Sequence, residues 1–350
     1  MSDTVSISGR MIGPGHPPYM IAEMSANHLG CLDRALAIMD AAKQAGADAI
    51  KLQTYTADTI TLDHNGPGFT VESGLWHGRR LHDLYREAHT PWDWHETLFA
   101  RGRQLGITVF SSPFDPTAIE LLESLGAPAY KIASFEIVDL PLIAQAAKTT
   151  KPLIISTGMA NLSEISEAVT TARGAGSGGI VLLHCVSGYP TPPEDSNLKR
   201  LVTLTNRFDA LVGLSDHTLG TTTAIAATAL GAVAIEKHIT LKRTDGGPDS
   251  AFSLEPQEFK ALVVECHTAF AALGSGADVR AKSEEANAKF RRSLYVVADI
   301  KAGECFTEGN VRSIRPGFGL APKHLPEIIG KKALKKIKRG TPLDQKMIGR

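Results

Sequence analysis

Short apolar runs alternate with longer amphipathic segments from residue 18 to about residue 275, and this alternation restricts the chain to few folds. The intervening segments have a helical period, and several end in Gly, which accepts the left-handed conformation that stops a helix. Near-continuous apolar strands between helices indicate a parallel sheet covered on both faces. The strands expected are 19–23, 49–53, 107–112, 129–134, 152–157, 180–185, 211–216 and 233–239.

Eight such units within about 275 residues are the number and length typical of a (β/α)₈ TIM barrel. An open doubly wound sheet is the alternative, but no GxGxxG follows the first strand, so a dinucleotide-binding fold lacks its main signal. The fold class predicted is therefore α/β, with a barrel domain over residues 1–275.

The last sixty residues have a different pattern. RRSLYVVADIKAGECFTEGNVRSIRP alternates apolar and polar residues between turns, which predicts a small β-rich domain over 291–350. The polar stretch 276–290 is expected to be a linker. The basic run KKALKKIKRG (331–340) is interpreted as an edge and turn of this domain, not as a nucleic-acid site.

The overall charge excludes some partners. The chain has 37 basic and 37 acidic side chains, which gives no electrostatic reason to bind nucleic acid or an anionic membrane. It has no run of about 18 apolar residues, and its first ten residues lack the apolar core of a signal peptide. The four cysteines are scattered and form no CxxC pair, so we expect reduced thiols in a cytoplasmic protein.

Polar side chains follow nearly every apolar run, and the sequence AIEKHI (234–239) is the most concentrated case. Burying adjacent ionisable groups costs several kcal/mol unless they are paired or bind something. In a barrel the carboxyl ends of the strands meet at one face, where active sites lie. One shared pocket is therefore predicted from Glu23, Lys51, Gln53, Ser111, Ser112, Lys131, Ser134, Glu136, Ser156, Thr157, His184, Ser187, Tyr189, Ser215, His217, Glu236 and His238.

Two histidines end the neighbouring seventh and eighth strands. His217 and His238 can converge on one divalent metal ion, leaving coordination positions for water and substrate oxygens. Each histidine taken alone could equally have a structural role.

Lysines and hydroxyls at the same strand ends predict an anion site. Lys51 and Lys131, with Ser112, Ser134, Ser156 and Ser215, form a set of donors suited to a phosphate and a carboxylate. The alternative for each serine is that it caps the helix that follows.

Several motifs together resemble the sialic acid synthases over essentially the whole chain. These are IAEMSANHLG (21–30), STGM (156–159), LLHCVSGYPTPPED (182–195), GLSDHTLG (213–220) and GGPDSAFSLEP (246–256). The resemblance implies a transferase that condenses phosphoenolpyruvate with an N-acylated amino sugar. GLWHGRRLHDLY (74–85), TPWDWH (90–95), YKIASFE (130–136) and SIRPGFGLAPK (313–323) resemble the pseudaminic acid branch, with the N-acetylneuraminate and legionaminate branches as alternatives.

The resemblance also implies roles for individual residues. A divalent cation on His217 and His238, Mn²⁺ with Mg²⁺ or Co²⁺ as alternatives, would polarise the sugar aldehyde. Glu23, expected to face the cation across the barrel axis, would assist water addition before phosphate leaves by C–O cleavage. Gln53, Glu136, Tyr189 and Asp249 would bind the sugar; Ser187 stands where the family often has Asn and would contact the phosphate; Asn27 and His28 would shape the first loop.

The family ends in an antifreeze-like (SAF) domain that reaches across a dimer. The resemblance therefore implies a domain-swapped homodimer in which the tail contributes one arginine, here Arg315, to the sugar site of the partner's barrel.

Other function classes remain open at this point. A Schiff-base aldolase could use Lys131 or Lys237 as its nucleophile, and a carbohydrate-binding protein without activity could use the same pocket. A cysteine hydrolase through His184 and Cys185 is disfavoured because adjacent strand residues point to opposite faces.

Overall fold

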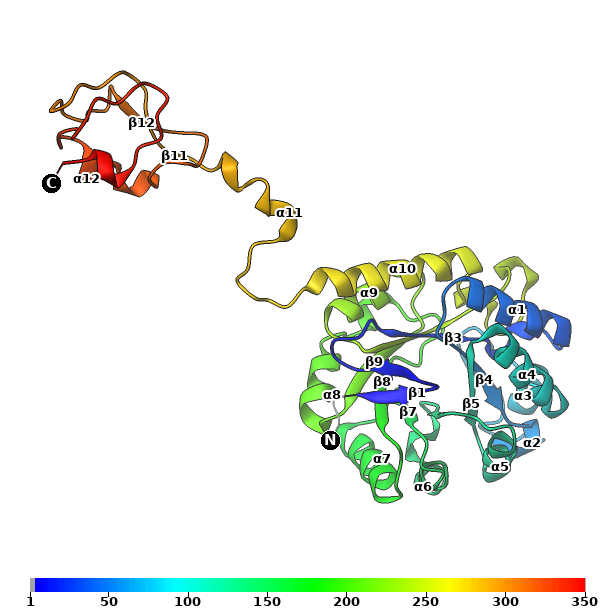
Figure 1. Ribbon diagram of the computed structural model, residues 1–350. Helices are drawn as coiled ribbons and strands as arrows, with labels where there is room; N and C mark the ends of the chain where they lie inside the picture. The colour runs from blue at the N-terminus through cyan, green and yellow to red at the C-terminus, as the bar shows by residue number, and fades with distance from the viewer. Residues whose placement is uncertain (1–3, 350) are drawn as a thin grey trace. The chain divides into compact units, whose positions relative to one another are not determined.

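The computed structural model describes residues 4–349, and these form two compact units. The first unit ends at Gly274 and the second begins at Ser275 (Figure 1). No helix within residues 4–349 is both long and apolar enough to cross a membrane.

The first unit is built on a closed barrel of eight parallel strands, which confirms the predicted fold (Figure 1). The order around the barrel is β10-β3-β4-β5-β6-β7-β8-β9, so the first and last strands pair and no edge remains. The strands are β3 (Tyr19–Glu23), β4 (Ala49–Thr54), β5 (Thr108–Pro113), β6 (Tyr130–Ile132), β7 (Leu153–Ser156), β8 (Ile180–Cys185), β9 (Leu211–Asp216) and β10 (Ala234–His238).

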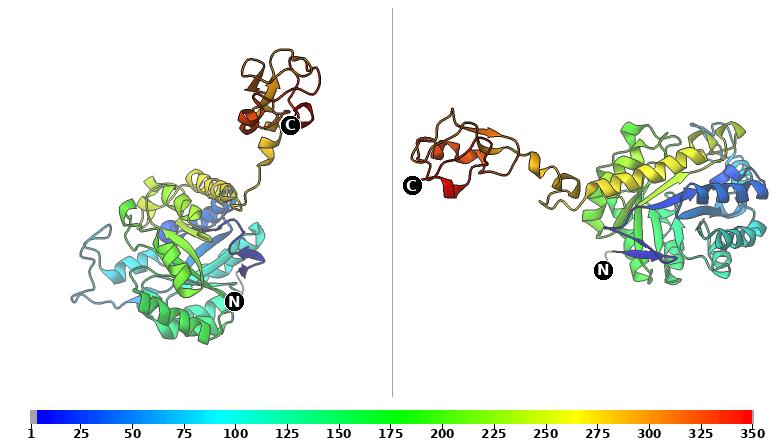
Figure 2. Two further views of the ribbon diagram at one scale, coloured as in Figure 1. Left: turned by 90° about the vertical axis from the view of Figure 1, so that its left-hand side faces the viewer. Right: turned by 45° about the horizontal axis from the view of Figure 1, so that its top comes forward.

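Helices surround this barrel, and their apolar faces pack against the outer face of the sheet. Side-chain caps explain several helix starts: Asp115, Asp139 and Asn161 accept hydrogen bonds from backbone amides of the first turn. α10 packs beside α9 and α1 (Figure 2). The helices of this unit are α1 (Leu32–Gln44), α2 (Ala57–Ile60), α3 (Leu81–Ala88), α4 (His95–Leu105), α5 (Pro116–Ser124), α6 (Leu140–Lys148), α7 (Leu162–Gly174), α8 (Arg200–Phe208), α9 (Thr222–Ala229) and α10 (Pro256–Leu273).

Strand alternation divides the barrel side chains into two sets. One set packs under the helices and includes Met20, Ile50 and Ile235. The other fills the barrel interior and includes Tyr19, Ile21, Phe110, Ala129, Ile154, Leu183 and Ala234. Two residues after Ile21, Ala129 and Ala234, the inward positions carry charged side chains, and these form the floor of the site described below.

A short hairpin before the barrel was not predicted from the sequence. β1 (Val5–Ile7) and β2 (Arg10–Ile12) pair antiparallel around a turn at Ser8 and Gly9, which both have positive φ. Such a turn matches the right-handed twist of the two strands. Val5, Ile7 and Ile12 join the apolar cluster of the barrel interior, so the hairpin helps to close the barrel core.

The second unit is small and has its own core. β11 (Ser293–Val296) and β12 (Val311–Ile314) pair antiparallel, and several isolated bridges extend the β structure. The α-helices of this unit are α11 (Lys282–Glu285) and α12 (Leu325–Ile328). The core comprises Leu294, Val296, Ile300, Phe306, Val311, Ile328, Ala333, Ile337, Leu343 and Ile348.

Candidate active site

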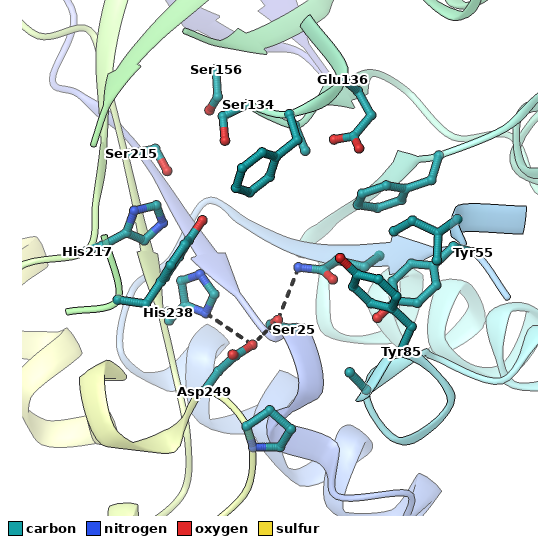
Figure 3. Close-up of a pocket in the computed structure, with 18 of the residues that line it drawn as sticks. Ser25, Tyr55, Tyr85, Ser134, Glu136, Ser156, Ser215, His217, His238 and Asp249 are labelled. Atoms are coloured by element: carbon teal, nitrogen blue, oxygen red, sulfur yellow. Dashed lines mark hydrogen bonds and ion pairs between the residues drawn. The ribbon is translucent and has the colours of Figure 1, made fainter. Parts of the chain in front are cut away.

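A cavity of about 490 Å³ lies at the carboxyl ends of the barrel strands (Figure 3). It is mostly apolar on one side and ionic on the other, as small-molecule sites often are. Its lining includes Ser25, Lys51, Gln53, Tyr55, Trp76, Tyr85, Phe114, Lys131, Ser134, Glu136, Ser156, Cys185, Tyr189, Ser215, His217, Glu236, His238 and Asp249.

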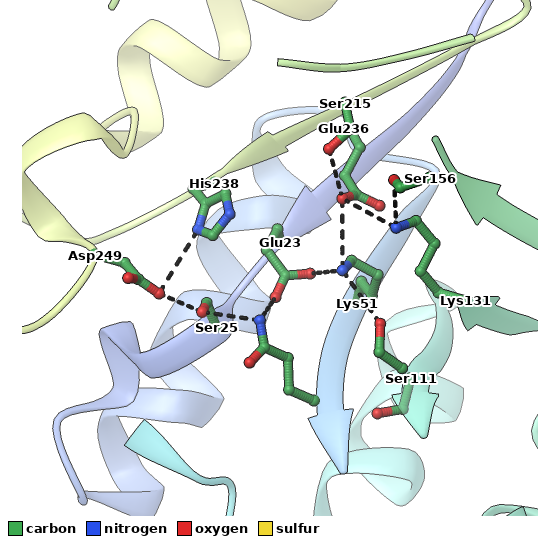
Figure 4. Close-up of polar contacts among 12 residues, drawn as sticks. Glu23, Ser25, Lys51, Ser111, Lys131, Ser156, Ser215, Glu236, His238 and Asp249 are labelled. Carbon is green, nitrogen blue, oxygen red and sulfur yellow. Dashed lines mark hydrogen bonds and ion pairs between the residues drawn. The ribbon is translucent and has the colours of Figure 1, made fainter. Parts of the chain in front are cut away.

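Two lysines and two glutamates form a buried ionic network on the cavity floor (Figure 4). Lys51 Nζ lies 2.8 Å from Glu23 Oε2 and 3.5 Å from Glu236 Oε1. Lys131 Nζ lies 3.9 Å from the same Glu236 oxygen. All four side chains are inward positions of β3, β4, β6 and β10, so the barrel itself positions them.

The pKa values in this network diverge. Burial raises the pKa of Glu23 to about 7, against the lowering effect of Lys51. Burial alone would raise the pKa of Glu236 as well, but Lys131 and Lys51 more than offset it, and the pKa falls below its ordinary value. Burial lowers the pKa of Lys131. Glu23 is therefore the carboxyl of the network that can exchange a proton near neutral pH.

Serines surround the same lysines. Lys131 Nζ donates to Ser156 Oγ at 2.7 Å, and Lys51 Nζ lies 3.4 Å from Ser112 Oγ. The four predicted serines do not cap any of the described helices, so the capping alternative is wrong for them. The remaining two serines make other contacts: Ser215 donates to Glu236 at 3.0 Å, and Ser134 lies 3.0 Å from the Ser187 hydroxyl.

The two predicted metal ligands lie side by side, with ring centroids 5.5 Å apart. His217 Nδ1 donates to the Val186 carbonyl at 2.9 Å, because a carbonyl can only accept, and this leaves a lone pair on Nε2. Burial lowers the pKa of both imidazoles, so both are neutral at pH 7. His238 Nδ1 lies 3.9 Å from Asp249 Oδ2 and has no hydrogen-bond partner within residues 4–349.

This pair fits an open metal site. Within residues 4–349 no group of three or more His, Cys, Asp or Glu side chains is placed to hold a metal ion, so a closed structural site is not formed. Two buried neutral imidazoles with available lone pairs instead leave coordination positions for water and substrate.

Glu23 lies in a different place from the one expected. β3 pairs directly with β10, and Glu23 is the register partner of His238. The expectation that Glu23 faces His217 and His238 across the barrel axis is therefore wrong. Glu23 stands beside the histidine pair, because closure of the barrel makes the first and eighth strands neighbours.

The residues predicted to bind a sugar surround this point. Gln53 Nε2 donates to Glu23 Oε1 at 3.0 Å and to Ser25 Oγ at 3.1 Å, and Ser25 donates to Asp249. The Tyr189 ring packs on His217 with centroids 4.5 Å apart. Glu136 lies further along the lining, and burial raises its pKa to about 7.

Sequence reasoning missed several lining residues. Ser25 has positive φ and bridges Gln53 to Asp249, a role that only the folded loop defines. Tyr55, Trp76 and Phe114 lie in loops and Tyr85 lies in α3, and none of them was given a role. Glu236 was placed at the strand end but given no role, although its spacing of two from His238 puts both on one face of the strand.

Other candidates lie outside the cavity. Lys237 points away from the barrel interior and pairs with Asp216 at 2.7 Å, so it cannot act as a nucleophile in this cavity. His184 Nε2 contacts the Ser196 carbonyl at 2.7 Å, on the opposite face from Cys185, and the hydrolase pair is not formed. Ser111 bonds to Thr54 behind the sheet.

Asn27 and His28, the two predicted residues of the first loop, do not line the cavity. Asn27 donates to the Ile239 carbonyl and to Ser253, both at 2.9 Å, so it does hold the first loop, and His28 packs on Trp94. Arg315 belongs to the second unit, where it is exposed just after β12, and its predicted role stays a prediction.

Comparisons with known proteins agree with this geometry. The sequence profile of the NeuB family matches residues 38–278, and that of the SAF domain matches residues 291–349. The chain is 46% identical to the pseudaminic acid synthase of Helicobacter pylori over 93% of this chain and 96% of that protein. It is 38% identical to the N,N'-diacetyllegionaminic acid synthase of Campylobacter jejuni over 91% of this chain and 96% of that protein.

A solved structure is also similar. The N-acetylneuraminic acid synthetase of Leptospira borgpetersenii, crystallised with citrate, is 33% identical and superposes with a TM-score of 0.74, covering 82% of this chain and 95% of that one. The profile match spans more than half of the chain, and the barrel, the lysine–glutamate floor and the histidine pair accompany it. This chain belongs to the NeuB family and ends in a SAF domain.

Proposed function

We propose that this chain is a pseudaminic acid synthase, which condenses phosphoenolpyruvate with 2,4-diacetamido-2,4,6-trideoxy-L-altrose and releases phosphate. One cavity carries the proposal, because two lysines, several serines and two neutral imidazoles meet there. Glu23, whose pKa is raised to about 7, pairs with one of these lysines. Pseudaminic acid synthases of Helicobacter pylori and Campylobacter jejuni, each 46% identical to this chain, support the choice of sugar.

Phosphoenolpyruvate would bind at the lysine side of the cavity. Lys51 and Lys131 supply charge for its phosphate and carboxylate, and Ser112, Ser134, Ser156, Ser187 and Ser215 supply hydroxyl donors. Charge-assisted hydrogen bonds from buried donors hold such anions strongly. Glu236 bridges the two lysines at 3.5 and 3.9 Å and thereby fixes their positions.

The condensation forms a bond between the methylene carbon of phosphoenolpyruvate and the aldehyde carbon of the open-chain sugar. A water oxygen then adds to C2, and the C–O bond to phosphate breaks. Glu23 would accept the proton of that water, since burial raises its pKa to about 7 and its partner Lys51 stabilises the carboxylate. Gln53 holds one carboxylate oxygen of Glu23 and thereby orients it.

His217 and His238 would hold a divalent cation, with Mn²⁺ proposed and Mg²⁺ or Co²⁺ as alternatives. Such an ion supplies Lewis-acid polarisation of the aldehyde oxygen when it is bound. Mn²⁺ binding followed by electron paramagnetic resonance should be lost in His217→Ala and His238→Ala, while His77→Ala, an exposed histidine, should bind as wild type does. Equal binding by all four proteins would remove the metal proposal.

The second unit would complete the site of another copy in a domain-swapped homodimer, with Arg315 reaching the sugar. Large apolar side chains are exposed on loops at the carboxyl ends of the strands, including Phe135, Val138, Met159 and Leu219. Exposed apolar residues around a cavity mouth suit a covering surface. The four unpaired cysteines accord with a cytoplasmic, reducing location.

One observation favours a second candidate function. Burial lowers the pKa of Lys131, and a lysine with a lowered pKa can form a Schiff base with a carbonyl substrate. Borohydride in the presence of sugar would then trap a covalent adduct on Lys131. Unchanged protein mass after this treatment, with phosphate still released from phosphoenolpyruvate, would reject this candidate.

The route of phosphate release tests the proposed reaction. Phosphoenolpyruvate labelled with ¹⁸O at the bridging oxygen should transfer its label to phosphate, because C–O cleavage leaves that oxygen on phosphorus. Mass spectrometry of both products measures this directly. Label recovered in the sugar acid would show P–O cleavage and contradict the proposal.

A further inference from the structure

The cavity has a second side whose chemistry differs from that of the ionic floor. Tyr55 and Tyr85 lie across the cavity from His217 and Ser215 (Figure 3). Aromatic and aliphatic side chains dominate this second side, which we call the apolar wall: Tyr55, Ile60, Val71, Leu81, Leu84, Tyr85, Ala88 and Phe114.

All but one of the wall residues come from a single stretch, residues 55–88, between β4 and α4. This stretch folds back on itself: Val71 N donates to the Arg79 carbonyl and Leu81 N to the Phe69 carbonyl, both at 2.9 Å. Trp76 Nε1 donates to the Pro248 carbonyl at 2.9 Å and ties the stretch to the loop that carries Asp249. These hydrogen bonds hold the wall in place through contacts within the protein itself.

The aromatic rings fix the wall from the inside. Tyr55 packs edge-on against Tyr85 and Phe114, with centroids 5.8 and 5.0 Å apart. Both tyrosines line the cavity, and a phenol hydroxyl can donate a hydrogen bond to a substrate amide. Ile60 and Val71 offer contacts to carbon only.

The direction of the substrate follows from the position of the chemistry. Under the proposed function, on which this inference rests, the aldehyde carbon must lie near His238 and Glu23. The opposite end of the sugar chain then extends toward the side of the cavity away from the histidines. A methyl group against Ile60 and Val71 is stabilised by apolar contacts, whereas a hydroxyl group in contact with these two side chains would lose its water without gaining a partner.

We propose that the apolar wall is the subsite for the deoxygenated, methyl-bearing end of the sugar, and that Ile60 and Val71 set selectivity against a 6-hydroxyl group. An apolar pocket rejects a substrate with one added hydroxyl on the order of 10²-fold. Selectivity for a 6-deoxy sugar is then a property of residues 55–88, separate from the residues that perform the condensation.

Two sugars that differ only at C6 test this inference. Wild type should use 2,4-diacetamido-2,4,6-trideoxy-L-altrose with a kcat/KM on the order of 10²-fold above that of its 6-hydroxy analogue. The double variant Ile60→Thr, Val71→Thr keeps both side chains β-branched, adds two hydroxyls and removes the terminal methyl group of Ile60. We expect this variant to reduce the ratio of the two kcat/KM values about tenfold, mainly by raising kcat/KM for the 6-hydroxy sugar. Val202→Thr, on the exposed face of α8 and outside the cavity, is the matched control and should keep the wild-type ratio.

Calorimetry with the corresponding alditols, which lack the reactive aldehyde, gives an answer independent of turnover. The 6-deoxy alditol should bind wild type more tightly than the 6-hydroxy alditol does. In the double variant, the two dissociation constants should lie closer together. Equal binding of both alditols, no binding of either, or an unchanged ratio in the double variant would overturn the inference. If the inference fails in one of these ways but phosphate is still released with either sugar, the proposed function stands. No phosphate release with either sugar would contradict the proposed function itself.

Discussion

At the scale of single residues, the floor of the cavity depends on balanced charge. Glu23 and Glu236 face Lys51 and Lys131, and all four are buried. Removing one partner from such a set leaves an uncompensated buried charge, which destabilises a protein more than the intact pair stabilises it. Conservative substitutions that keep shape and hydrogen bonding therefore separate chemical roles from structural ones.

Glu23→Gln keeps the shape of the side chain and an acceptor for Gln53, but it cannot accept a proton. We expect phosphate release to fall by at least about 10²-fold, the usual contribution of a positioned base. Phosphoenolpyruvate binding should persist, because Lys51 retains Glu236 at 3.5 Å. Stopped-flow phosphate detection and equilibrium binding measure the two effects. Turnover close to wild type would show that Glu23 is not the base.

The raised pKa of Glu136 predicts how stability depends on pH. Burial raises this pKa from 4.5 to about 7, so the folded state holds the proton more tightly than the unfolded chain. This group's contribution to stability is therefore complete below about pH 4.5 and is lost as the pH rises through 7, by at most about 3 kcal/mol. Glu136→Gln should flatten that fall. Denaturant unfolding at pH 5 and pH 8 can be followed by fluorescence, because all three tryptophans lie in the barrel unit.

Identical pH dependence of wild type and Glu136→Gln would contradict this prediction. Glu327→Gln, an exposed glutamate of the second unit, serves as the control and should behave as wild type does.

At the scale of elements, strand alternation explains which polar residues could be predicted. The apolar runs identified the eight barrel strands, and their ends identified the floor. The same rule separates Glu236 and His238, which face the cavity, from Lys237, which pairs with Asp216 behind it. The sequence pattern contains that distinction, since period two is a local property of any strand.

The apolar wall could not be predicted in the same way. Its position depends on contacts between residues far apart in sequence, such as Trp76 with Pro248 and Tyr55 with Phe114. The β1–β2 hairpin was missed because each strand has three residues, too few for a periodic signal. The position of Glu23 beside His238 follows from closure of the barrel, which no local pattern encodes.

Trp76 ties the stretch 55–88 to the loop that carries Asp249. Trp76→Phe keeps an aromatic ring beside Tyr189 but loses the hydrogen bond to Pro248. A net loss of about 1 kcal/mol should raise the KM for the sugar about fivefold, with the KM for phosphoenolpyruvate unchanged. Trp94→Phe, which packs on His28 outside the cavity, is the control. Equal changes in both KM values would show that the wall does not act on the sugar alone.

At the scale of the whole molecule, the barrel and the SAF domain each have their own apolar core. If the SAF domain acts on a neighbouring barrel, two defective subunits can restore one another. Arg315→Ala has an intact barrel and a defective tail, and His238→Ala has the reverse.

Equal amounts of these two variants, allowed to exchange subunits, should recover about one quarter of wild-type activity. Half of the dimers are then mixed, and each mixed dimer has one site built from an intact barrel and an intact tail. Phosphate release measures the recovery, and native mass spectrometry of mass-tagged subunits verifies the exchange. A mixture as inactive as its components, after proven exchange, would show that the tail acts on its own barrel.

Substrate choice distinguishes a pseudaminic acid synthase from the other synthases of the family. Phosphoenolpyruvate is offered with N-acetylmannosamine and with 2,4-diacetamido-2,4,6-trideoxy hexoses of L-altro and D-manno configuration, and phosphate release is measured for each. We expect turnover with the L-altro sugar alone, because the enzyme is proposed to make pseudaminic acid. Preferred turnover of N-acetylmannosamine or of the manno sugar would contradict that claim.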